Sequence, residues 1–386
     1  MMRIVVTGYG ACTSVGDTAD ACFDAFTAGT SGAAPLKHLD APHFNARTAY
    51  ERDETGTKGR FRSSAFLRRA LIDAVAMAGI DQDTETAAVY VGTGLRELRS
   101  AELALLAGEQ MDVSELDFTA AVRGVLPKSR RVHTLSNACA ASNYALALAT
   151  DAIRAGRCDI AIAAGCDTLT ASMFGLLDRV NPDVPEAVQV FDQNRKGVLM
   201  GDGGVALIVE SLDSALAAGR KPLAEIRAVG LSTDAVHETA PDMSGIRRAV
   251  DDAFARADLT PEQVDLIYVH GTGTSLNDAT ESAVLADVYV ASETKPALSG
   301  LKAMTGHTSG ASGAIGVVAA IKSLKTGLVP PTPGTDTPVP EADGFALSET
   351  CASREIDLVQ VNAFGFGGVT SVVLVSDIKE MAHAAE

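Results

Sequence analysis

The sequence predicts an α/β protein made of two similar halves, and three observations lead to this prediction. Short apolar runs that end in glycine turns recur at corresponding places in the two halves. An amphipathic helical stretch precedes the same run in each half. Hydrophobic residues make up 47% of the 386 residues, which is enough for a compact core and excludes a disordered chain.

Four pairs of runs are expected to form buried strands, because each run is short, apolar and bounded by polar residues or glycine. The paired runs are residues 3–10 with 224–231, 88–94 with 266–273, 159–165 with 357–365, and 203–210 with 368–375. Amphipathic helices are expected at residues 64–78 and 244–257, before the second strand of each half. Four matched positions favour a duplicated unit over two unrelated α/β domains.

An alanine-rich, charged stretch at residues 211–222 separates the two halves. We therefore divide the chain into an N-terminal half, residues 1–215, and a C-terminal half, residues 216–386. The first contains Cys139, and the second contains the motifs around His270 and His307 described below. Two α/β halves of this kind resemble the thiolase fold, in which they stack into α/β/α/β/α layers.

Charge and composition exclude several classes of function. The formal net charge of −17 argues against nonspecific binding to nucleic acid or to an anionic membrane, because like charges repel. The start of the chain lacks the charged segment and long apolar core of a signal peptide, and no apolar stretch is long enough to span a membrane. The six cysteines are scattered without zinc-binding spacing, so neither disulfides nor a metal site is expected. We expect a cytoplasmic protein.

One thiol, two histidines, a lysine and a glycine turn follow one another in an order suited to thioester chemistry: Cys139, His270, Lys302, His307 and Gly365-Phe-Gly-Gly368. Cys139 precedes a strongly helical run, so we expect it at a helix N-terminus, where the dipole and free N–H groups favour the thiolate. Glycines in the last turn let backbone N–H groups approach a reacting oxygen. Taken singly, a cysteine is more often a buried apolar residue and a histidine more often structural, so the combination carries the prediction.

The order and local sequence of these motifs resemble the β-ketoacyl-[acyl-carrier-protein] synthases of fatty acid and type II polyketide synthesis. The likeness is to the elongating type, which has one cysteine and two histidines. The resemblance implies that Cys139 carries the acyl chain, and that His270 and His307 stabilise the enolate formed when a malonyl thioester loses CO₂. It also implies an oxyanion site at the backbone N–H groups of Cys139 and Phe366. Phe366 would then act as a gate, in a turn shaped by its two glycine neighbours, Gly365 and Gly367.

The same resemblance assigns supporting roles. Lys302 is expected in a structural network with Asp278 and Glu281 as partners, and the alternative for these two acids is a solvated helix start. Thr272 and Thr274 are expected to hold the phosphopantetheine arm of an acyl carrier protein. Because that arm arrives with the carrier protein, no tightly bound cofactor is expected.

Positive charge gathers in two places, at Lys58, Arg60, Arg62, Arg68 and Arg69 and again at Arg123, Lys128, Arg130 and Arg131. In this family, an acidic helix of the acyl carrier protein docks on such a patch. A solvated helix face or the edge of a dimer explains the same residues equally well.

The leading hypothesis is a 3-oxoacyl-ACP synthase, an acyltransferase that joins an acyl group on Cys139 to malonyl-ACP by decarboxylative Claisen condensation. A type II polyketide pathway or a specialised fatty acid pathway is expected. Two alternatives stay open: an acyltransferase of the same fold that works without decarboxylation, and a chain-length subunit, against which Cys139 argues. We expect a homodimer, with a heterodimer with a related subunit as the alternative. Residues 94–139 form a shorter segment than is usual in the family, which leaves the acyl chain length open.

Overall fold

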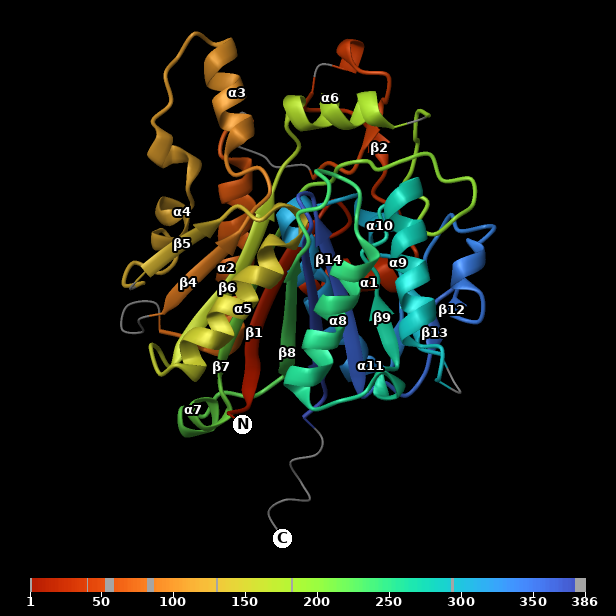
Figure 1. Cartoon of the computed structure of the whole chain (residues 1–386). Coiled ribbons are helices and arrows are strands. Elements are labelled where there is room, and N and C mark those ends of the chain that lie inside the picture. Colours follow the sequence, from red (N-terminus) through yellow and green to blue (C-terminus); the bar gives the residue numbers. More distant parts are fainter. Residues whose placement is uncertain are drawn as a thin grey trace.

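The computed structural model describes residues 2–39, 41–52, 59–81, 87–129, 131–181, 183–292 and 295–378. One large sheet runs through the molecule, with helices on both of its faces (Figure 1). The N-terminal half contributes β1 (Ile4–Thr13), β4 (Ala88–Gly92), β5 (Arg131–Leu135), β6 (Ile160–Asp167) and β7 (Gly203–Ser211). The C-terminal half contributes β8 (Ala224–Thr233), β9 (Leu266–Tyr268), β10 (Ala297–Ser299), β12 (Ala346–Leu347), β14 (Leu358–Gly365) and β15 (Val369–Ser376).

The helices lie between these strands, and short strand pairs lie outside the large sheet. The helices are α1 (Ala19–Thr27), α2 (Arg62–Ala78), α3 (Leu98–Leu106), α4 (Thr119–Arg123), α5 (Ala141–Arg154), α6 (Ala171–Val180), α7 (Leu212–Ala217), α8 (Met243–Ala257), α9 (Ser275–Val288), α10 (Lys302–Thr305) and α11 (Ser312–Thr326). Short 3₁₀ helices lie at Ala41–His43, Val113–Leu116, Ala138–Ala140, Pro261–Gln263, Ser309–Ala311 and Pro340–Ala342. The short pairs are β2 (Ala34–Pro35) with β3 (Thr48–Ala49), and β11 (Leu328–Val329) with β13 (Ala352–Ser353).

The strand order confirms that the chain repeats one unit. Toward the centre of the sheet, the first half runs β5-β4-β6-β7-β1 and the second runs β10-β9-β14-β15-β8, with the short β12 added outside β10. Each half joins its first three strands in parallel and its last three antiparallel. The halves meet where β1 pairs with β8 through Val5 opposite Glu225 and Val6 opposite Ala224. All four predicted strand pairs are therefore present, and the sequence missed a fifth, β5 with β10.

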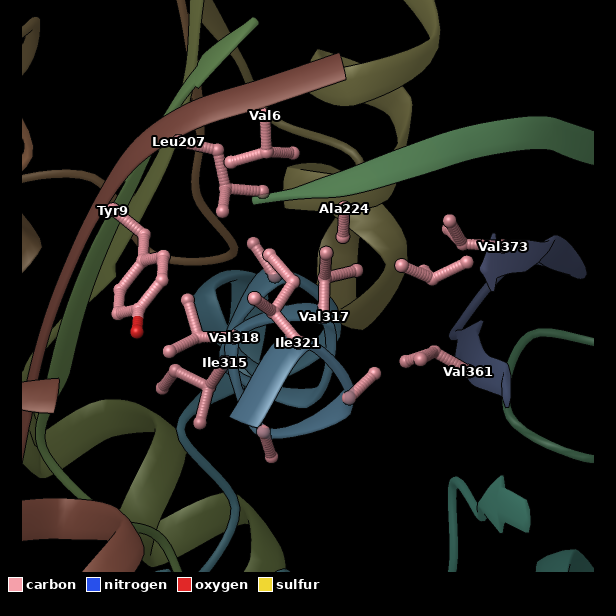
Figure 2. Close-up of a cluster of buried hydrophobic side chains, with 14 of the residues drawn as sticks. Val6, Tyr9, Leu207, Ala224, Ile315, Val317, Val318, Ile321, Val361 and Val373 are labelled. Atoms are coloured by element: carbon pink, nitrogen blue, oxygen red, sulfur yellow. The ribbon is translucent and has the colours of Figure 1, made fainter. Parts of the chain in front are cut away.

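Two helices, α5 and α11, lie between the N-terminal and C-terminal halves of the chain. They contact one another, and each also contacts strands of both halves. α11 is buried around nearly its whole circumference, as expected for a helix that is apolar on all sides. Figure 2 shows its side chains Ile315, Val317, Val318 and Ile321 packed among residues of β1, β7, β8, β14 and β15. This arrangement fits the predicted thiolase fold.

The outer helices α2 and α8 correspond to the two predicted amphipathic helices, and they cover β1 and β8 respectively. Glycine lets each helix approach its strand closely. A Cβ added at Gly10 of β1 would lie 2.2 Å from the carbonyl oxygen of Ala70, and one at Gly230 of β8 would lie 2.1 Å from that of Ala249. The two halves thus use the same small-residue contact at equivalent places.

Residues 215 and 216 both lie inside α7, in the connection between β7 and β8. We propose that the boundary between the two halves lies in this connection, and residues 215 and 216 mark its middle. Within the described ranges, no helix is both long and apolar enough to cross a bilayer.

Replacing Gly230 by alanine is expected to destabilise the protein by about 1–3 kcal/mol, because the added methyl group collides with the backbone of α8. Urea denaturation of the full chain measures this change. Gly124→Ala is the matched control, since Gly124 has a φ of −67° and the nearest atoms would be 3.4 Å from its new Cβ. Equal stability of the two variants would show that the close contact between α8 and β8 is unimportant.

Candidate active site

Cys139 lies in the 3₁₀ turn that leads from β5 into α5, as its helical sequence context predicts. The residue before it, Ala138, has a φ of +48°, a left-handed conformation that is costly for a non-glycine residue. The glycine turn after β14 packs directly on this bend. A Cβ on Gly365 would lie 3.1 Å from the Cβ of Ala138 and 3.2 Å from the backbone nitrogen of Cys139, so glycine makes this close approach easier.

The electrostatics of the thiol differ from the sequence-based expectation of a thiolate. Burial raises the pKa of Cys139 to about 11, and the nearby Asp167 carboxylate adds to this rise. The charge of Lys302 and hydrogen bonds from the backbone N–H groups of Phe366 and Cys139 itself oppose it without cancelling it. The loss of water around the sulfur thus outweighs the helix N-terminus, and the resting group at neutral pH is a thiol.

His270 follows β9 and is buried with 3% of its surface exposed. The Nζ atom of Lys302 lies 3.3 Å from its Nδ1 and also donates to its backbone oxygen. Burial, followed by the charge of Lys302 and the nearness of His307, holds the pKa of His270 well below its usual range. Because the ammonium group of Lys302 can only donate, Nδ1 accepts, and the neutral ring carries its proton on Nε2.

His307 reaches the same place from the turn after α10, where its backbone N–H donates to Leu199. Its Nδ1 accepts from the backbone N–H of Ser309 at 3.1 Å and lies 3.2 Å from the hydroxyl oxygen of Ser312. Burial and then Lys302 lower its pKa well below the usual value, so this ring is also neutral with its proton on Nε2. The two ring centres are 5.4 Å apart at an angle of 79°. The structure therefore brings two N–H donors together from distant parts of the chain.

Burial lowers the pKa of Lys302 to about 8, against the opposing charges of Glu281, Cys139 and Asp278. Asp278 and Glu281 are completely buried, so the alternative of a solvated helix start is wrong. Their carboxylates hold the backbone of the loop after β9. Glu281 accepts from the N–H groups of His270 and Gly271, and Asp278 accepts from those of Thr272 and Gly273. Glu281 thus fixes the position of His270 through its own backbone, and Asp278 fixes the loop that follows it.

Cys139, His270, His307 and Phe366 line one cavity of about 310 Å³. The hydroxyl oxygens of Thr272 and Thr274 lie 2.8 Å apart on its wall. Apolar side chains of α6 and α9 cover another part of the wall: Met173, Leu176, Leu177, Val180 and Leu276. Phe366 keeps 42% of its surface exposed and can contact both the solvent and the cavity. The size and mixed lining suit a long apolar ligand with a polar end.

The predicted basic patch is only partly correct. Arg62 is buried and donates to Asp202, Thr168 and the backbone of Arg52, so it cannot reach a partner protein. Arg60 forms an ion pair with Glu109 at 2.7 Å. Arg68 and Arg69 are exposed, although Arg69 also lies 3.4 Å from Asp73. Lys58 and Arg130, which belong to the two predicted clusters, lie outside the described residues.

Sequence reasoning missed Asp167, whose buried carboxylate accepts from Thr93 Oγ1 and from three backbone N–H groups, those of Gly94, Leu95 and Gly310. It ties the end of β4 to the turn before α11. Burial nevertheless raises its pKa to about 6. It also missed Ser312, which contacts His307. Each is a common residue in no recognisable motif, so no signal in one sequence could have found them.

Alkylation of Cys139 by iodoacetamide is expected to accelerate roughly tenfold per pH unit between about pH 7 and 9, because the thiolate fraction rises toward a pKa of about 11. Peptide mass spectrometry on the full chain measures the rate, and the exposed Cys351 provides an internal comparison. Replacing Lys302 by methionine should slow alkylation, since its charge lowers the pKa of the thiol. A rate that is level above about pH 7.5 would contradict the raised pKa.

Comparisons with known proteins agree with this geometry. The family models "Beta-ketoacyl synthase, N-terminal domain" and "Beta-ketoacyl synthase, C-terminal domain" match residues 1–215 and 223–336. Nodulation protein E of Rhizobium meliloti is 32% identical over 243 residues, which cover 63% of this chain and 61% of that relative, less than two thirds of its length. Putative polyketide beta-ketoacyl synthase 1 of Streptomyces cyaneus is 30% identical over 412 residues, covering 97% of this chain and 98% of that one.

Among solved structures, one titled "The ishigamide ketosynthase/chain length factor" superposes with a TM-score of 0.87. It is 31% identical in sequence, and the match covers 97% of this chain and 99% of that chain. The similarity therefore extends over both halves and over the cavity between them. The chain belongs to the β-ketoacyl synthase family.

Proposed function

We propose that this chain is a β-ketoacyl-ACP synthase that condenses an acyl group on Cys139 with malonyl-ACP, in a type II polyketide or specialised fatty acid pathway. The proposal depends on the pair of neutral histidines, His270 and His307, which line the same cavity as the Cys139 thiol. Their Nδ1 atoms accept hydrogen bonds, so each ring has an Nε2–H group left to donate. An acyl transfer without decarboxylation forms no enolate, so it would need only the backbone N–H donors and not the two histidine donors. The pair therefore favours condensation over the simple acyltransferase.

In the first step, the sulfur of Cys139 attacks the thioester carbonyl of the acyl carrier protein. A carbon–sulfur bond to Cys139 forms, the bond to the pantetheine sulfur breaks, and the proton of the thiol ends on the departing pantetheine thiol. Because Cys139 rests as a thiol, its proton leaves as the bond forms. The backbone N–H groups of Cys139 and Phe366, which lower the pKa of the thiol, are the donors that we assign to the oxyanion of this step.

In the second step, a malonyl thioester binds beside the acylated cysteine and loses CO₂. The electrons of the broken carbon–carbon bond form an enolate, whose oxygen accepts hydrogen bonds from the Nε2–H groups of His270 and His307. Neutral imidazoles suit this task, because they stay N–H donors without giving up a proton. The ammonium group of Lys302 adds a positive charge next to His270.

In the third step, the enolate carbon attacks the acyl carbonyl on Cys139. The tetrahedral oxyanion accepts hydrogen bonds from the backbone N–H groups of Cys139 and Phe366. Its collapse breaks the carbon–sulfur bond and releases the cysteine thiolate, which takes a proton from water. The product is a β-ketoacyl group on the carrier protein. The apolar wall of α6 and α9 is the surface that we assign to the growing acyl chain.

The proposed partner is an acyl carrier protein, whose phosphopantetheine arm would pass Thr272 and Thr274 on its way to Cys139. Of the first predicted basic group, Arg68 and Arg69 remain candidates for docking, because they are exposed on α2, and Arg123, Lys128 and Arg131 of the second group are exposed as well. A solved relative is described as an acyl carrier protein "in complex with its ketosynthase". We propose the same kind of complex here, with the synthase as a homodimer or paired with a related subunit.

Replacing either His270 or His307 by alanine should leave acylation of Cys139 intact and slow its discharge by malonyl-ACP roughly 10²–10³-fold, the effect of losing one oxyanion donor. Intact-mass measurements of the protein, first with a panel of acyl carrier proteins and then with malonyl-ACP, follow both steps. Cys139→Ala should form no adduct.

His43→Ala is the matched control, because His43 is exposed and lies outside the cavity. An acyl adduct on the unchanged protein that malonyl-ACP cannot discharge would contradict condensation and favour simple acyl transfer. The absence of any adduct would favour a chain-length subunit.

The discharge of preformed acyl-Cys139 by malonyl-ACP should fall as the pH rises through about 8. Burial lowers the pKa of Lys302 from 10.5 to about 8, so the charged form beside His270 predominates below that pH and disappears above it. A single-turnover measurement that starts from acylated Cys139 follows this step alone, because no free thiol is left whose titration could change the rate. Lys302→Met should be slower than the unchanged protein below about pH 8, approach its rate above that pH, and lack this alkaline decrease. A decrease that appears only near pH 10.5, the ordinary value, would contradict the lowered pKa.

A further inference from the structure

Four arginines line a second cavity, of about 250 Å³, at the end of the sheet opposite the active site. We call it the arginine pocket, and its lining residues are Met2, Arg3, Arg154, Glu225, Ile226, Arg227, Arg256 and Ala257. They come from the two residues before β1, from β8 and from the last turns of α5 and α8. In Figure 1 this region lies at the lower end of the molecule, near the mark for the N-terminus.

The pairing of the two central strands brings these charges together. Val5 of β1 lies opposite Glu225 of β8, and the same register, if continued two residues beyond the paired segment, would set Arg3 opposite Arg227. Like charges directly opposite each other on neighbouring strands are destabilising. The carboxylate of Glu225 is bound by Arg3, at 2.9 Å from Nε and 2.5 Å from Nη2. That ion pair neutralises Arg3, and no carboxylate on the described part of the strands pairs with Arg227.

The two helices add further guanidinium groups whose donors are incompletely used. Arg256 binds Asp252 at 2.8 Å, whereas Arg154 lies 3.8 Å from Asp151, at the limit of an ion pair. The Nε atom of Arg154 is buried and has no hydrogen-bond acceptor within the described part of the chain. In the same described ranges, no acceptor contacts the guanidinium group of Arg227. Each arginine carries five N–H donors, so several remain available to a ligand.

A purely structural explanation covers only part of this cluster. Arg154 and Arg256 end their helices, where positive charge is favourable because it opposes the helix dipole. Arg3 and Arg227 precede or belong to strands, and no helix end accounts for them. The protein as a whole has a net charge of −17, so a cavity with four arginines and one glutamate reverses the sign of its surroundings.

We propose that the arginine pocket binds a small molecule that carries a phosphate group. A phosphate dianion offers acceptors in the spacing that the planar guanidinium group of arginine recognises with two parallel hydrogen bonds. The cavity exceeds the size of phosphate alone, which leaves room for the molecule that bears it. The site is separate from the reaction, because α5 has 14 residues and sets its two ends roughly 21 Å apart. Cys139 lies at one end of this helix and Arg154 at the other.

Thermal unfolding of the full chain tests the proposal with inorganic phosphate as the probe. Phosphate should raise the unfolding temperature in a saturable way, beyond the effect of sodium chloride at the same ionic strength, because a ligand that binds only the folded state stabilises it. Titration calorimetry should give one site per chain. Arg227→Ala should weaken phosphate binding at least about tenfold, because hydrogen bonds between charged groups are lost.

Arg248→Ala is the matched control, since Arg248 is an exposed arginine of α8 outside the pocket and the substitution makes the same change in net charge. It should bind phosphate like the unchanged protein. Arg154→Gln offers a second test if Arg227→Ala does not fold, and it should also weaken binding. Equal effects of phosphate and chloride, or equal losses in Arg227→Ala and Arg248→Ala, would overturn the proposal.

Discussion

The burial of α5 and α11 between the two halves is the interaction on which the rest of the structure depends. Both helices are rich in small and apolar residues, and each contacts strands of both halves. Water is excluded from nearly the whole surface of α11, so its position is fixed by packing on every side. The 3₁₀ turns that lead into these two helices contribute Ala138, Cys139 and Ser309 to the wall of the active-site cavity.

The repeat explains why both turns have the same unusual backbone. Ala138 precedes α5 with a φ of +48°, and Ser309 precedes α11 with a φ of +47°. In one half this bend presents Cys139, and in the other it presents the N–H group that orients His307. The Asp167 carboxylate joins the second bend to the end of β4 and thereby links the halves across the site. One duplicated unit thus provides two different chemical functions from equivalent positions.

The same burial sets the protonation of the site. Loss of water is the largest cause of the shifted pKa values of Cys139, His270, His307 and Lys302. It favours the neutral form of each group, and only Lys302 keeps its charge at neutral pH. Buried carboxylates are tolerated because several N–H groups bind each of them, as for Glu281. At the far end of α5, the arginine pocket presents the opposite situation, with charged donors that lack enough acceptors.

The sequence by itself determined the repeat, the matched strands of both halves and the order of the chemical motifs. Apolar periodicity and glycine turns are local properties of the sequence. Because the unit is duplicated, each pattern occurs in both halves and can be recognised by comparing them. It missed β5 and β10 because β5 is a partly exposed edge strand and β10 has only three residues. Only the tertiary structure decided the charge states, because the pKa of Cys139 depends on how much water the surrounding fold removes. It also buried Arg62, Asp278 and Glu281, and it gathered Arg3, Arg154, Arg227 and Arg256. Burial and distance between remote segments arise from packing, which no local pattern records.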